Sequence, residues 1–303
     1  MKGTRLLSLV ACAAHLAWSA PASAAEAARP TVNRRTGLFE IPLSDLRKAA
    51  VRSDRVELAR AAGRLGPARL AKALADPDRR LVLAALEGIP LLPSGILLLD
   101  RVAPLFASAD QAIRARAVGT AAALLADSDP ERLAEWEIPA QATRWACHGL
   151  AAVALDEKEQ VATRLLAVQG LADAGRACAG SLKPAPLLSS AAPEIRRAAV
   201  LALPADPSAD ALLGATRDRD ERVAAAAGAQ LCQRKAKLPA GARPLHELAL
   251  ARNAEPEDVV DMLPCLMGAT DLAAQKAVED LREHGPAAVR DAIKAEAAKR
   301  LKP

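Results

Sequence analysis

Tyrosine is absent from this chain of 303 residues, and two phenylalanines and three tryptophans are its only aromatic residues. A core without large rings is built from alanine, leucine and valine, which suits the close packing of helices. Alternating runs of β-branched residues, the usual sign of strands, are missing as well. Hydrophobic residues nevertheless make up 51% of the sequence, enough for a substantial core. We therefore expect an all-α protein.

The sequence also lacks the motifs that mark common catalytic and metal sites. It contains no Gly-x-Ser-x-Gly, no Gly-x-x-x-x-Gly-Lys-Ser/Thr, no Cys-x-x-Cys and no His-Glu-x-x-His. Cys147 and His148 are adjacent, so they point to different sides of a helix. His246 and His284 have only a neighbouring glutamate as a partner of ligating type. From these absences we predict no catalytic residue, no cofactor, no metal site and no enzymatic activity.

Charge is distributed unevenly along the chain. Residues 29–80 contain 13 basic and 6 acidic residues, whereas residues 81–303 contain 26 basic and 29 acidic ones. A basic end is able to contact an acidic partner, an anionic lipid surface or nucleic acid. Its arginines stand at helical spacing without interleaved aromatics or glycines, so no nucleic-acid-reading motif is present. A solvated helix face is the favoured interpretation, no nucleic-acid partner is expected, and peripheral membrane contact stays open.

A short pattern recurs along the chain. It consists of an apolar residue, in several copies an arginine directly after it, and then an alanine three residues later. It is clearest from Ile113 to Val118 and from Ile195 to Val200, and apolar clusters precede each copy. Two apolar-striped helices joined by a short turn, repeated in this way, predict stacked helical hairpins. Separations of 33, 50, 32 and 28 residues divide the anchoring alanines, which are Ala84, Ala117, Ala167, Ala199 and Ala227.

The repeated unit resembles a HEAT repeat, in the short form also found in bilin-lyase-type HEAT proteins. The resemblance implies an α-solenoid over residues 43–303, with irregular stretches near 128–145 and 238–265. In that family an Asp/Arg alternation acts as a structural ladder. The aspartates precede several of the second helices as candidate N-caps: Asp76, Asp78, Asp110, Asp218 and Asp220. Arg114, Arg164 and Arg196 follow on first turns; the alternative is that these arginines form a ligand-binding or interaction row.

Residues 1–24 are typical of a secretory signal peptide. A basic start precedes about 13 mostly apolar residues, and a small-x-small cleavage site ends at Ala24. The apolar run is shorter than a membrane span. Residues 25–42 lack periodicity and are expected to form a flexible linker. We predict a periplasmic or secreted protein without a transmembrane segment. The alternative is a lipoprotein processed at Cys12, which follows a lipobox-like Leu-Val-Ala.

Four cysteines remain after the predicted cleavage, and an exported protein favours disulfides. Cys232 lies near the end of a helix expected at about 219–234, and Cys265 near the end of one at about 256–268. Because these two helices would run parallel, both cysteines would lie at the same edge, which predicts a bond between them. Cys147 and Cys178 would then pair with each other. The alternative is that the four are buried, unbonded side chains.

Tryptophan is rare, yet Trp136 and Trp145 both fall in the first irregular stretch. Trp136 is a candidate anchor for a partner, although packing into the interrupted repeat is the favoured interpretation. The sequence as a whole predicts an exported scaffold that binds an unidentified protein in the periplasm or cell envelope. The alternatives are a bilin-lyase-like or other enzyme, and a membrane-tethered envelope lipoprotein with a structural role. Bilin lyases act on cytosolic proteins, and this chain has few aromatics to line a chromophore pocket.

Overall fold

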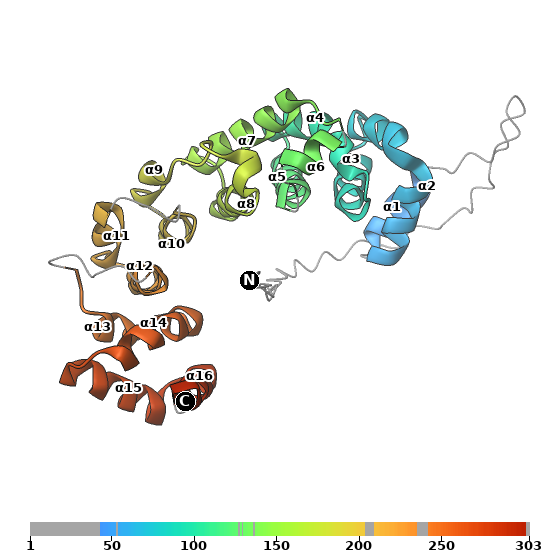
Figure 1. The fold of residues 1–303 in the computed structure, drawn as a ribbon. Coiled ribbons are helices and arrows are strands. Elements are labelled where there is room, and N and C mark those ends of the chain that lie inside the picture. The colour runs from blue at the N-terminus through green and yellow to red at the C-terminus, as the bar shows by residue number, and fades with distance from the viewer. Residues whose placement is uncertain are drawn as a thin grey trace, which may run out of the picture. The chain divides into compact units, whose positions relative to one another are not determined.

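The computed structural model describes residues 43–52, 54–126, 128, 130–135, 137–203, 209–234 and 242–300. Within these ranges all regular structure is helical and no strand occurs (Figure 1), which confirms the all-α prediction. The predicted signal peptide and linker lie outside the described residues, as do Cys12 and Trp136.

Helices of very different lengths follow one another along the described chain. The α-helices of the described residues are α1 (Leu43–Val51), α2 (Arg55–Leu74), α3 (Arg79–Gly88), α4 (Leu99–Val102), α5 (Gln111–Ala126), α6 (Pro130–Glu135), α7 (Ala140–Leu155), α8 (Val161–Asp173), α9 (Pro184–Leu188), α10 (Pro193–Leu201), α11 (Ala209–Thr216), α12 (Glu221–Gln233), α13 (Leu245–Ala249), α14 (Pro256–Gly268), α15 (Leu272–His284) and α16 (Ala287–Arg300). Short 3₁₀-helices occupy Ile89–Leu91, Gly95–Leu98, Ala103–Ala107 and Gly175–Cys178. Helix α6 falls within the first irregular stretch.

Aspartates begin several of these helices by accepting backbone N–H groups that have no partner inside the helix. Asp78 accepts from the N–H of Arg80 at 2.9 Å, and Asp110 accepts from that of Ala112 at 2.8 Å. Asp220 caps α12 in the same way. Asp76 differs from these, because it accepts from the N–H of Asp78 and so shapes the turn before α3.

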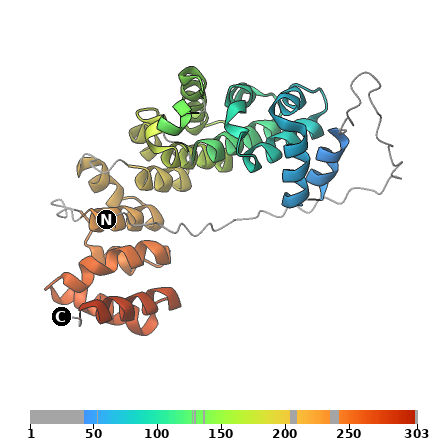
Figure 2. The same cartoon turned by 45° about the vertical axis from the view of Figure 1, so that its right-hand side comes forward.

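Long-range packing follows a single series of helices along the chain. In this series α3 packs on α5, α5 on α8, α8 on α10, α10 on α12, α12 on α14 and α14 on α16. Most members also pack on a helix adjacent in sequence, as α3 does on α2 and α8 does on α7. We call α3, α5, α8, α10, α12, α14 and α16 the helix row; its members can be followed in order in Figures 1 and 2.

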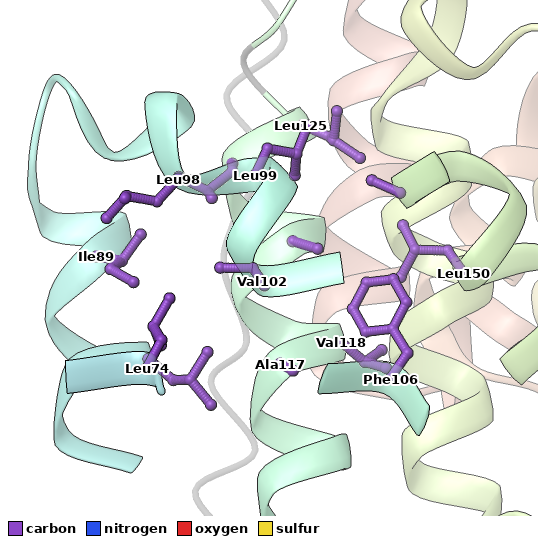
Figure 3. Packing of buried hydrophobic residues seen from close by; sticks show 14 of the residues in the cluster. Leu74, Ile89, Leu98, Leu99, Val102, Phe106, Ala117, Val118, Leu125 and Leu150 are labelled. Atoms are coloured by element: carbon purple, nitrogen blue, oxygen red, sulfur yellow. The ribbon is translucent and has the colours of Figure 1, made fainter. Parts of the chain in front are cut away.

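The repeat alanines lie at the centre of this packing. Ala117, Ala167, Ala199 and Ala227 are completely buried, and Ala84 is almost so. Figure 3 shows the surroundings of one of them, where Ala117 and Val118 of α5 face Val102, Phe106 and the leucines of neighbouring segments. Small anchors allow close approach of the helices, and the larger side chains fill the spaces between them.

Buried apolar residues form three clusters along the chain. The first extends from α1 to α10, the second involves α10 to α12, and the third extends from α12 to α16. The core of the described residues is thus divided into three clusters that follow one another along the chain.

Candidate interaction surfaces

Arg164, one of the predicted interaction residues, is buried in α8 and bonded on all sides. Its guanidinium donates to the carbonyl of Ala154 at 3.0 Å, to both carboxylate oxygens of Glu157 at 2.9 and 2.7 Å, and to the hydroxyl of Ser190 at 3.1 Å. The Arg164 hydrogen bond also lowers the pKa of Glu157 below its ordinary value. These bonds tie α8 to the turn before it and to the turn before α10.

Arg196 occupies the equivalent place in α10, with a side chain only 7% exposed. It donates to both carboxylate oxygens of Asp218 at 2.7 and 2.8 Å and to the carbonyls of Ser190 and Ala191. Burial raises the pKa of Asp218, but the hydrogen bonds and positive charge of Arg196, together with a bond from the backbone N–H of Asp220, hold the pKa below its ordinary value. The same bond raises the pKa of Arg196.

Arg114 makes a similar set of bonds from α5. It donates to Glu159 at 2.9 Å and to the carbonyls of Ser108 and Ala109 at 2.8 and 3.2 Å. In this way the three arginines each hold a helix of the row to a neighbouring turn. Because their donors are engaged inside the fold, this arrangement favours the structural ladder over a ligand-binding row.

Trp145 lies on α7, where its side chain is 56% exposed, while the adjacent Ala146 and Cys147 are buried. Its ring is therefore available on the surface beside the first disulfide. Among the predicted interaction residues that the structure describes, Trp145 is the one whose side chain is mostly exposed. Trp136 lies outside the described residues.

Both predicted disulfides are present. Cys147 of α7 is bonded to Cys178 across 5.4 Å between Cα atoms, and Cys232 of α12 is bonded to Cys265 of α14 across 5.9 Å. Each bond links segments that lie about one repeat apart in sequence, with separations of 31 and 33 residues. Disulfides of this kind are typical of proteins from oxidising compartments.

Two surface features of the helix row were not singled out from the sequence. On α8, Ala162, Leu166 and Gln169 are all exposed at the i, i+4, i+7 spacing that places them on one side of a helix. On the adjacent α10, Leu201 is exposed as well. We call these residues the inner-row face. Apolar periodicity alone marks such leucines as core, because only the packing of the next helix decides which of them stay uncovered.

A hollow of about 610 Å³ opens beside the second disulfide. Its lining includes Leu231, Cys232, Leu245, His246 and Cys265.

Among the described residues, no group of three His, Cys, Asp or Glu side chains is placed to hold a metal ion. No helix in the same ranges combines the length and apolarity needed to cross a membrane. The sequence matches no protein-family model and shows no significant match to a curated protein.

Proposed function

We propose that this protein is an exported scaffold without catalytic activity: an α-solenoid of HEAT-like repeats that binds another protein in the periplasm or cell envelope. The observation that carries the proposal is the helix row, in which each member packs on the next in chain order. Repeat proteins of this type extend by stacking, and their rows of equivalent helices form long binding surfaces. A protein partner is the class of ligand that such a surface suits.

The described side chains support a binding role in two ways. The arginines that could have formed a ligand site are engaged in internal bonds, whereas Leu166 and Leu201 leave apolar surface uncovered on adjacent helices of the row. Exposed apolar groups rimmed by polar ones are typical of protein interfaces. The two disulfides support export, because such bonds persist outside the reducing cytosol.

Affinity capture from the native cell envelope tests this proposal. We expect the parent chain to retain a stoichiometric protein, and the double variant Leu166→Asp/Leu201→Asp to retain at least about tenfold less, because two charges would be buried in the interface. Leu272→Asp is the matched control: Leu272 is an exposed leucine on α15, outside the row. Equal capture by all three chains would exclude the inner-row face as the binding surface. Urea unfolding curves should show that the double variant is folded.

A further inference from the structure

The first two helices are the most basic part of the described chain. Residues 43–74, which comprise α1 and α2, contain eight Lys and Arg residues against three Asp and Glu residues. The three carboxylates are partly engaged already: Asp54 caps α2, and Glu57 pairs with Arg60 at 2.6 Å. Little negative charge is therefore left to neutralise this end of the protein.

Most of the cations in residues 43–74 have no ion-pair partner among the described residues. Arg47 pairs with Asp78, and Arg60 with Glu57. The other six are exposed and form no ion pair with any part of the chain that the structure describes; they are Lys48, Arg52, Arg55, Arg64, Arg69 and Lys72. This differs from Arg114, Arg164 and Arg196 of the helix row, whose guanidinium groups are bonded inside the fold.

Three of these cations converge on one hollow between the two helices. Lys48 of α1, Arg52 in the turn directly after α1, and Arg64 of α2 line a space of about 250 Å³. Ala49 and Ala61 and the carboxylates Asp45 and Glu57 complete the lining. Since Glu57 is already paired with Arg60, the cations outnumber the free carboxylate. The hollow is suited to an anionic group of small size, such as a phosphate.

Apolar side chains project beside these cations. Val51, the last residue of α1, is 77% exposed, and Val56, in the first turn of α2, is 60% exposed. Arg52 and Arg55 stand next to them in sequence. Single apolar side chains flanked by basic ones are what an interfacial membrane contact uses, because the former enter the acyl boundary while the latter bind lipid phosphates.

We propose that α1 and α2 form a docking surface for an anionic phospholipid bilayer, with Lys48, Arg52 and Arg64 binding headgroup phosphates and Val51 and Val56 entering the interface. Charge complementarity selects an anionic surface. The exposed valines favour a bilayer over a nucleic acid, which would leave them in water, and residues 43–74 contain no aromatic side chain on which a base could stack. This surface belongs to α1 and α2, whereas the inner-row face belongs to α8 and α10.

Sedimentation with vesicles tests the charge requirement. The chain from Ala25, the predicted mature product, should bind vesicles that contain phosphatidylglycerol, bind pure phosphatidylcholine weakly, and be released by raised salt. The variant Arg52→Glu/Arg64→Glu should bind at least about tenfold more weakly. Its control is Arg219→Glu/Arg252→Glu, which reverses the charge of two other exposed arginines that form no ion pair in the described residues. This control should change vesicle binding by less than about twofold. Thermal unfolding should confirm that both variants are folded.

The valines provide a second, independent test. Val51→Ser/Val56→Ser should weaken vesicle binding several-fold while leaving its salt dependence unchanged, whereas Leu272→Ser should have no effect. Equal binding to neutral and anionic vesicles, or equal losses in the arginine variant and its control, would overturn the proposal. So would displacement from the vesicles by a DNA duplex or by inositol hexakisphosphate at equal phosphate concentration, because the site would then be one for soluble polyanions.

Discussion

At the scale of single residues, Arg196 and Asp218 place opposite charges in surroundings that exclude most water, with side chains 7% and 13% exposed. Removing charges from water is costly, and the cost is offset only where the geometry is good and the remaining donors are bonded. Here both carboxylate oxygens and two backbone carbonyls accept from the one guanidinium. The pair therefore tolerates loss of either partner poorly.

We expect Arg196→Ala to lower the free energy of unfolding by about 2–4 kcal/mol, because Asp218 and the carbonyls of Ser190 and Ala191 would lose their donor. Arg80→Ala is the control: Arg80 is exposed in α3 and makes no ion pair in the described ranges, so its loss should cost no more than about 0.5 kcal/mol. Urea unfolding followed by circular dichroism measures both. Similar values for the two variants would show that the Arg196 bonds contribute little.

At the scale of elements, the contact between α5 and α8 depends on a residue without a side chain. A Cβ added at Gly170 would overlap Ala122 of α5 and lie 3.0 Å from its Cα atom, so a neighbouring backbone stands in the way. Gly214, within α11, has no atom within 4 Å of such a Cβ. The same substitution thus has opposite consequences at these two helical positions.

Gly170→Ala should destabilise the protein by about 1–3 kcal/mol, because α5 and α8 would have to move apart. Gly214→Ala should instead stabilise it by about 0.5–1 kcal/mol, since alanine restricts the unfolded chain and favours the helix. Chemical denaturation gives both values. A stabilising effect of Gly170→Ala would mean that the two helices lie farther apart than described.

The two disulfides join residues that are 31 and 33 positions apart in the sequence, so they close loops of similar length. By the chain-entropy model a loop of this size contributes about 3–4 kcal/mol. Cys232→Ser/Cys265→Ser should therefore lower the unfolding free energy by roughly this amount, and so should Cys147→Ser/Cys178→Ser. Adding a reductant to the parent should lower its stability below either variant. A variant without the four cysteines should not respond to the reductant, and free thiols in the untreated parent would contradict both bonds.

Sequence reasoning located some elements well. The helix expected at about 256–268 is α14, Pro256–Gly268, and the one expected at about 219–234 is α12, Glu221–Gln233. Strong apolar periodicity and clear end signals explain this success. The kink of α2, where Gly66 has a φ of 68° before Pro67, was not foreseen. Nor was the exposure of Leu166, because it depends on which neighbouring helix covers which side chain.

At the scale of the whole described unit, a polar contact joins helices that belong to different buried clusters. Arg197 of α10 donates to Asp258 of α14 at 2.8 Å, reaching past α12 across 61 residues of sequence. Burial raises the pKa of Asp258, although the neighbouring Arg197 acts in the opposite direction. No sequence motif marks this pair, because its two residues come together only through the packing of α10, α12 and α14, three consecutive members of the helix row.

If stability is distributed along the chain, a local defect should stay local. Met262 is fully buried in the cluster of α12 to α16, and Leu150 in that of α1 to α10. Either residue changed to alanine should lose about 2–5 kcal/mol of packing. In a stack of nearest neighbours, Met262→Ala should speed amide hydrogen exchange in α13 to α16 and leave α1 to α5 unchanged, and Leu150→Ala should leave α16 unchanged. Hydrogen exchange read by mass spectrometry under native conditions measures these local changes. A uniform increase of the exchange rate in every helix would instead indicate one cooperative unit and contradict the proposed solenoid.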